Sequence, residues 1–280
     1  MSTIKKLSLL LGAVLLGTFM LLGFFGREVY RKAPPIPERV ASASGRVLFT
    51  KEDILTGQQV WQSIGGQQIG TIWGHGAYQA PDWSADWLHR EATTLLEDFA
   101  TRGGATSYAS AAPELQAALR ERLRGELRTN TYDAQSGTVT VSDARAAAIA
   151  RTAAHYHALF GADPALAELR SAYALQDGAI PDPARRDKLT AFYFWTAWAC
   201  ATERPDGTST YTNNWPHEPL IGNVPTAPNV IWSILSVIML LAGVGGLVYW
   251  QAFRRREEPL PEPPASDPFA RLQLTPSMRA

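Results

Sequence analysis

The stretch Gly57–Gly70, GQQVWQSIGGQQIG, decides how the rest of this 280-residue chain is interpreted. Thr50 precedes it, and Asp53 follows Thr50 by three residues, which is the spacing of a capping box at the start of a helix. We therefore predict a helix over residues 51–64, followed by a turn because glycines are concentrated at its end. On spacing alone, a helix followed by a glycine-rich turn is a sufficient interpretation.

The same stretch is also similar to the haem-attachment segment of a cytochrome c from which the haem ligands are missing. There, a Gly-x-x-aliphatic-aromatic turn, here Gly57 to Trp61, leads into Cys-x-x-Cys-His. Gly66 and Ile69 stand at the two cysteine positions, and Gly70 stands at the histidine position. Because a c-type haem needs two thiolates and an imidazole on its iron, the sequence predicts a cytochrome-like segment that binds no haem.

The remaining residues supply no alternative ligands. Cys200 is the only cysteine, and no methionine lies between Met20 and Met239. The histidines show no metal-ligand spacing, and no nucleophile elbow or phosphate-binding glycine loop is present. We therefore expect no catalytic and no metal-binding residue. The alternative that stays open is proton handling by His217 with Glu218. A net charge of zero argues against a nucleic-acid partner.

Two apolar segments are long enough to cross a membrane. Residues 7–26, LSLLLGAVLLGTFMLLGFFG, form a run that covers roughly the 30 Å hydrocarbon core at about 1.5 Å per residue. A cleaved signal peptide is the rival interpretation, but no small-x-small cleavage site follows the run. The second segment, 230–253, has tryptophan or tyrosine near both ends, as at membrane interfaces.

Charges next to the second segment indicate the topology. Arg254, Arg255 and Arg256 follow it directly, which places its end in the cytoplasm. The predicted order is a cytoplasmic terminus (1–6), a first span (7–26), a periplasmic domain (27–229), a second span (230–253) and a cytoplasmic proline-rich connector (254–280). Arg27, Arg31 and Lys32 oppose this orientation for the first span, so the assignment depends on the second.

The domain between the spans is predicted to be mainly helical. We expect a helix over 85–102, capped by Ser84, and a second helix that begins at Ser142 or Asp143 and ends at Gly161. A third helix begins with Asp182 as its cap and Pro183 at its first position and runs to about Thr202, and Thr129–Ser142 is expected to form a small β-hairpin. Leucines every four residues from Leu115 form one apolar stripe. The arginines around this stripe are expected to form a solvated face, with a phosphate or lipid-headgroup site as the alternative. These are Arg120, Arg122, Arg124 and Arg128.

Three segments together resemble one family. They are Gly57–Glu91, Phe192–Pro205 (FYFWTAWACATERP) and Tyr211–Asn223 (YTNNWPHEPLIGN), and they lie between the two apolar segments. The chain resembles the N-terminal part of the quinol-dependent nitric oxide reductases, in which a haemless cytochrome c-like domain is fused to a haem-copper-oxidase-like membrane core. Trp73 to Tyr78, WGHGAY, also matches this family.

The resemblance implies a bacterial inner-membrane protein whose periplasmic domain caps the catalytic core. The core, fused or separate, would hold haem b and non-haem iron and would take electrons from quinol, so none of these cofactors is expected in this chain. Its reaction, nitric oxide to nitrous oxide, is not expected of these 280 residues alone, because no family metal ligand is found in them. Core-interface or proton-handling positions are expected at Trp195, Trp198, Trp215, His217 and Glu218.

Two other classes of function stay open. A two-span sensor with a periplasmic ligand-binding domain has the same topology, although the residues after Phe253 are proline-rich and lack heptads. A free-standing periplasmic enzyme is the other alternative, and it lacks a catalytic constellation. The sequence leaves open whether the chain is a fragment or a separate subunit.

Overall fold

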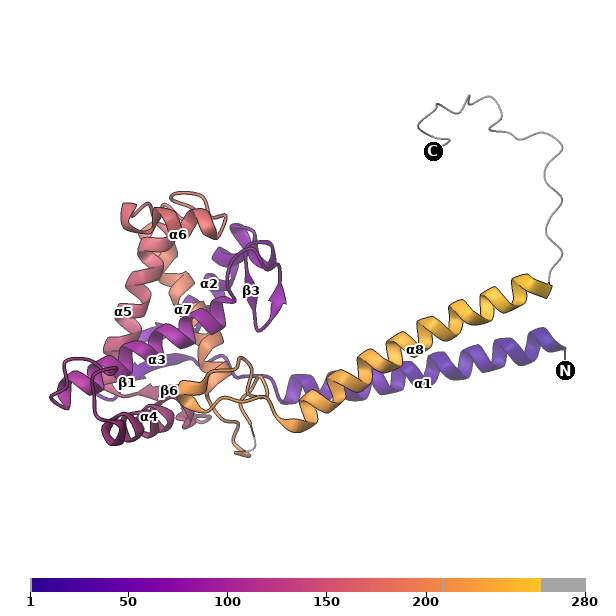
Figure 1. Ribbon diagram of the computed structural model, residues 1–280, viewed down its shortest axis with the longest axis horizontal. Coiled ribbons are helices and arrows are strands. Elements are labelled where there is room, and N and C mark those ends of the chain that lie inside the picture. The colour runs from indigo at the N-terminus through magenta and orange to yellow at the C-terminus, as the bar shows by residue number, and fades with distance from the viewer. Residues whose placement is uncertain (1, 208, 258–280) are drawn as a thin grey trace, which may run out of the picture. The chain divides into compact units, whose positions relative to one another are not determined.

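The computed structural model describes residues 2–207 and 209–257. The chain divides into two units, residues 1–226 and 227–280 (Figure 1). The proline-rich stretch Pro259–Pro268 lies outside the described residues, so its prediction is not tested.

Both apolar segments are helical, as predicted. Helix α1 spans Thr3–Arg31, and α8 spans Ala227–Glu257. Each contains a stretch long and apolar enough to cross a membrane. None of the residues in either stretch is buried within the protein, so both present apolar side chains that need lipid or another protein around them. The helices are longer than the predicted spans because polar residues extend both ends.

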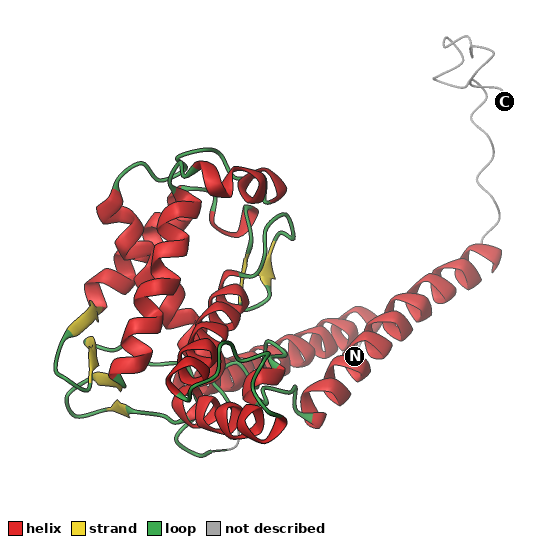
Figure 2. Ribbon diagram, turned by 60° about the vertical axis from the view of Figure 1, so that its left-hand side comes forward, coloured by secondary structure: helices red, strands yellow, loops and turns green. Residues whose placement is uncertain are grey.

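The residues between these two helices in the sequence form a domain made mostly of helices, with short strands (Figure 2). In chain order, its elements are β1 (Arg39–Ser42), β2 (Val47–Thr50), α2 (Lys51–Ser63), η1 (Gly66–Gln68), β3 (Thr71–Ile72), β4 (His75–Gly76), α3 (Trp83–Arg102), α4 (Pro113–Arg128), β5 (Tyr132–Asp133), β6 (Thr138–Val141), α5 (Asp143–Phe160), η2 (Pro164–Leu166), α6 (Ala167–Ala172), α7 (Pro183–Ala201) and η3 (Pro219–Ile221).

Most of the predicted helix ends are confirmed. The side chain of Thr50 accepts the Asp53 N–H, and that of Asp53 accepts the Thr50 N–H, so the capping box of α2 is complete. Ser142 caps α5 and Asp182 caps α7. Each cap satisfies a backbone N–H that the helix itself leaves without a partner.

The predicted cap of α3 is wrong. Asp82, not Ser84, precedes this helix, and its Oδ1 accepts the N–H groups of Ser84 and Ala85. The other oxygen, Oδ2, accepts the N–H of Gly74 at 2.8 Å. A carboxylate is favoured at the N-cap of α3 because its two oxygens accept several hydrogen bonds at once. Ser84 lies inside the helix, where its hydroxyl accepts the Trp73 N–H.

The predicted hairpin is confirmed as β5 and β6, which pair antiparallel. It belongs to a larger sheet, in the order β2-β1-β6-β5, that the sequence did not predict. β1 pairs antiparallel with β2 and parallel with β6, from Arg39 opposite Thr138 to Ser42 opposite Val141. The sheet thereby joins the residues just after α1 to the middle of the chain.

The helix α7 forms the centre of the domain, packed against α2, α3 and α5. At Gly57, α2 crosses α7 so closely that a Cβ there would lie 2.0 Å from the carbonyl oxygen of Lys188. Glycine is therefore required for this crossing. The rings of Trp61 and Phe192 pack beside it, with centroids 5.7 Å apart.

Candidate functional site

The residues at the degenerate haem positions lie in a tight turn after α2. Gly66 is buried and begins η1, while Ile69 is half-buried and packs on the core. Gly70 is buried, has a φ of 149° and lies against the indole of Trp83. A Cβ at Gly70 would lie 2.4 Å from Nε1 of Trp83 and 2.9 Å from the carbonyl oxygen of Pro81. This position has no room for a histidine side chain.

Trp83 is itself held by aromatic rings on several sides. Its indole stacks on Tyr193, with a centroid distance of 5.6 Å and an interplanar angle of 10°. The rings of Tyr156, Phe160 and Tyr173 also contact it. Because Trp83 is fully buried, it cannot move aside without opening a cavity.

These residues do not fit a covalently bound haem. Cys200 is buried on α7, and burial raises the pKa of its thiol well above the usual value, which disfavours the thiolate. Within residues 2–207 and 209–257, no group of three or more His, Cys, Asp or Glu side chains could hold a metal ion. We therefore derive no chemical step through haem in this domain.

Two segments that carry the family resemblance, Trp73–Tyr78 and Tyr211–Asn223, contact each other in the structure. A Cβ at Gly74 would lie 3.4 Å from Cζ2 of Trp215, so the second motif packs on the first. The Trp73 indole N–H donates to the carbonyl of Thr196 at 2.9 Å, and its ring lies 5.4 Å from that of Trp195. We call the half-buried side chains Trp73, Trp195 and Trp215 the tryptophan face. It brings together three segments that lie far apart in sequence.

Exposed polar residues flank these tryptophans in the sequence. His75 and Tyr78 follow Trp73, and His217 follows Trp215; all three are exposed, with Tyr78 at 89%. Half-buried indoles beside exposed polar groups form a surface suited to a protein partner.

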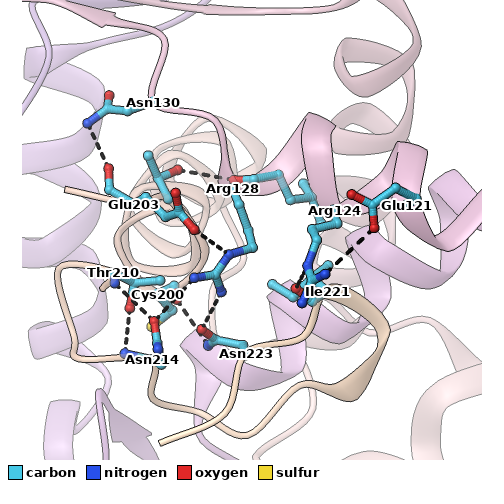
Figure 3. Close-up of polar contacts among 12 residues, drawn as sticks. Glu121, Arg124, Arg128, Asn130, Cys200, Glu203, Thr210, Asn214, Ile221 and Asn223 are labelled. Atoms are coloured by element: carbon cyan, nitrogen blue, oxygen red, sulfur yellow. Dashed lines mark hydrogen bonds and ion pairs between the residues drawn. The ribbon is translucent and has the colours of Figure 1, made fainter. Parts of the chain in front are cut away.

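An arginine on α4 holds the segment that carries Trp215. Arg128 donates through Nε to Glu203 at 2.9 Å and through Nη1 to Asn223 at 3.0 Å, as Figure 3 shows. Its Nη2 lies 3.4 Å from Oδ1 of Asn214. The amide of Asn223 in turn donates to the carbonyl of Cys200. One guanidinium thus ties both ends of this loop to α4 and to the end of α7.

The four arginines around the leucine stripe follow the predicted solvated face in part: Arg120, Arg122 and Arg124 are exposed, whereas Arg128 is not. The side chain of Arg128 is only 12% exposed and belongs to the hydrogen-bond network above. Arg124 donates to the carbonyl of Ile221 at 3.3 Å (Figure 3), and Arg122 lies over the ring of Phe99. Arg120 is exposed, as expected. The prediction is wrong only for Arg128, because its partners come from distant parts of the chain.

The side chains of the predicted pair His217 and Glu218 lie in different environments. Glu218 is buried, and its Oε2 lies 2.9 Å from Nδ1 of His89, a residue of α3 that the sequence did not single out. His217 is exposed. Nothing here tests a proton-handling role, which stays a prediction, but the contact made by Glu218 is with His89.

Of the predicted interface tryptophans, only two are accessible. Trp195 and Trp215 belong to the tryptophan face, whereas Trp198 is 2% exposed and packs on Tyr211 at 5.5 Å. Of the neighbouring aromatic residues, Phe192, Tyr193 and Phe194 are buried in the domain. Most apolar side chains of α7 are thus buried against other parts of the domain. The interface role of these positions is untested.

Sequence reasoning missed a buried ion pair between α3 and α5. Arg145 donates through Nε to Glu91 at 2.7 Å, and the two side chains are 2% and 1% exposed. Glu91 also accepts the indole N–H of Trp87. The one sequence signal was Glu91 four residues after Trp87 on the same helix face. Its partner lies in an alanine-rich helix and gave no signal of its own.

Taken together, these features define a class of protein: a mostly helical domain that is flanked in the sequence by two candidate membrane helices. Comparison with known families makes this specific. Residues 37–217 match the family described as the NorB cytochrome c-like domain of nitric oxide reductase, and the chain belongs to that family. The resemblance seen in the sequence is thereby confirmed. No curated protein matches the chain.

Proposed function

We propose that the chain is a non-catalytic N-terminal part or subunit of a quinol-dependent nitric oxide reductase. In this role the domain caps the outer face of a haem-copper-oxidase-like core, fused or separate, that holds haem b and non-haem iron. The observation that carries the proposal is the family match over residues 37–217, and the close approach of Trp83 to Gly70, the predicted histidine position, supports it. A relay of electrons through this domain is not needed if quinol delivers them within the membrane.

The proposed contact with the core is the tryptophan face. Tryptophan contributes strongly to protein interfaces because it combines a large apolar area with an N–H donor. Two of the three indoles use that donor inside the domain: Trp73 on Thr196, and Trp195 on the carbonyl of Pro35 at 2.9 Å. Their orientation is therefore fixed before any partner binds, which lowers the entropy cost of docking.

The proposed location is the bacterial inner membrane, with the domain on the periplasmic side. Support comes from the sequence around α8, where Arg254, Arg255 and Arg256 follow the apolar stretch. Denitrification or nitric oxide detoxification is the process in which such a reductase acts.

Where the core is a separate protein, the test is co-purification of that membrane protein with this chain from the native membrane. An affinity tag on this chain should retain a partner with many apolar spans and haem b absorbance. The variant Trp215→Ala should reduce the retained fraction, whereas Leu55→Ala, an exposed position on α2, should not. Equal retention by both variants would refute the proposed contact. A stoichiometric haem c band on the purified chain alone would refute the haemless assignment.

A further inference from the structure

A cavity of ≈ 410 Å³ lies between β2, α5 and α7, but a larger one lies where α1 ends. This second cavity has a volume of ≈ 650 Å³, and we call it the helix-exit cavity. Three segments line it: the residues at the end of α1, the start of the β5–β6 hairpin, and the loop after α7. The lining residues are Arg31, Lys32, Ala33, Pro35, Asn130, Tyr132, Ala134, Arg204, Pro205, Asp206 and Tyr211.

Hydrogen bonds hold these three segments in place. The carbonyl of Pro35 accepts the indole N–H of Trp195. Asn130 donates through Nδ2 to the carbonyl of Glu203 at 2.9 Å and to the hydroxyl of Tyr211 at 3.2 Å. Glu38 and Gly137 are joined through their backbones at 2.8 Å, which fixes the hairpin next to the exit of α1. The cavity is therefore preformed.

Its charge is predominantly positive. Three cationic side chains, Arg31, Lys32 and Arg204, line it together with one carboxylate, Asp206. Arg31 pairs with Glu28 at 3.0 Å, but within the described residues the Lys32 ammonium has no ion-pair or hydrogen-bond partner. Arg204 donates through Nη2 to the carbonyl of Tyr211, while its Nε is buried and unpartnered in the described chain. Lys32 is thus the exposed cationic donor that is available to an oxyanion, and the charge of Arg204 adds to the positive potential.

The position of the cavity indicates which oxyanion. Arg31 is the last residue of α1, whose apolar stretch is long enough to span a bilayer, so the cavity opens at the level expected for lipid headgroups. Apolar residues, including Ala33, Pro35, Ala134 and Pro205, share its lining with the cations. An amphiphilic cavity of this kind fits a phosphate together with its glycerol backbone better than a free ion.

We infer that the helix-exit cavity binds the phosphate-bearing headgroup of an anionic phospholipid in the membrane leaflet next to the domain. Lys32 and Arg204 supply the positive charge, and the Tyr211 hydroxyl supplies a further donor. The bound lipid fixes the depth of α1 and the distance of the domain from the bilayer. This inference depends on α1 spanning the membrane. It does not depend on the docking of a catalytic core, because the cavity lining does not include the residues of the tryptophan face.

The test uses the full chain, purified in a neutral maltoside detergent, and native mass spectrometry. Short-chain phosphatidylglycerol is titrated in parallel with short-chain phosphatidylcholine and with inorganic phosphate. We expect saturable retention of one phosphatidylglycerol, weaker retention of phosphatidylcholine, and no displacement by equimolar phosphate. The variant Lys32→Gln should weaken phosphatidylglycerol binding about tenfold, the effect of losing one charged hydrogen bond. Tyr211→Phe, which removes only a hydroxyl, should weaken it less.

The matched control is Lys6→Gln, which removes the same charge at the other end of α1. Because Lys32 is exposed, its replacement should leave the melting temperature unchanged, and this is checked in the same preparations. Equal effects of Lys6→Gln and Lys32→Gln would show general charge attraction and overturn the site. Displacement of the lipid by equimolar phosphate would replace the lipid with a free anion and overturn the inference as stated.

Discussion

Replacing Gly70 with alanine tests whether the haem position is rigidly filled. The added Cβ would lie 2.4 Å from Nε1 of Trp83, which is 1.0 Å inside the 3.4 Å where ordinary contact begins. The indole cannot retreat easily, because Tyr193 stacks on one face and further rings contact its edges. Retreat of the backbone is also restricted, because the Pro81 carbonyl would lie only 2.9 Å from the new atom.

The expected cost has two parts. Backbone strain at a φ of 149°, where side chains are rare, contributes about 1–3 kcal/mol. Overpacking against a buried ring contributes about 1–3 kcal/mol more. A central value of about 4 kcal/mol corresponds to a decrease of about 8–16 °C in melting temperature for a domain of this size. That loss is a large fraction of a typical folding free energy of about 5–15 kcal/mol.

The assay is thermal unfolding of the full chain in detergent, followed by intrinsic tryptophan fluorescence. Gly104→Ala is the matched control, because Gly104 also has a positive φ, 86°, but nothing lies within 4 Å of its missing Cβ. It should cost only the backbone strain, about 1–2 kcal/mol. If Gly70→Ala and Gly104→Ala melt at the same temperature, then Trp83 yields without cost and the argument for a filled haem position fails.

Three further outcomes follow from the same structure. Burial, and then the charge of Arg90, lowers the pKa of His155 from 6.5. The unfolded chain therefore binds more protons at this residue, and the free energy of unfolding falls as the pH decreases below about 6.5. His155→Phe should make the melting temperature less dependent on pH between 7 and 5.5, and an unchanged slope would contradict this. Arg128→Met should accelerate amide hydrogen exchange in residues 210–223 by loosening both ends of the loop, and exchange restricted to α4 would speak against that role. Glu91→Gln should destabilise the domain by about 3–5 kcal/mol because it leaves the buried Arg145 charge uncompensated, as chemical denaturation would measure, and a loss below about 1 kcal/mol would refute it.

Those parts of the fold that depend on neighbouring residues could be predicted from the sequence. The cap of α2 is formed by residues three apart, and α7 begins with an aspartate directly before a proline. Both are local chemical signals, so the helices were placed almost correctly. Ser84 was selected as a cap because it is a good capping residue, but Asp82, two residues earlier, accepts more hydrogen bonds.

Contacts between distant residues were not predictable in this way. The partners of Arg128 lie 75, 86 and 95 residues away in sequence, and a solvent-facing arginine has the same local sequence as a half-buried one. The pairing of β1 with β6 is equally non-local, and strands of four residues carry little pattern of their own. Trp83 likewise gave no sign that it would occupy the space beside Gly70. The close packing of Trp83 against Gly70 became visible only when both residues were placed in space.

Under the proposed haemless assignment, the packing of Trp83 against Gly70 accounts for how a cytochrome c-like domain is stable without a cofactor. A ligand that binds only the folded state adds to folding stability, so a domain that gives up such a ligand must replace that contribution. A buried tryptophan removes about 150–250 Å² from water, worth about 4–6 kcal/mol as an upper estimate. Trp83 can therefore supply through packing what a bound cofactor would have supplied. It follows that restoring cysteines at positions 66 and 69 and a histidine at position 70 would not restore haem binding while Trp83 remains.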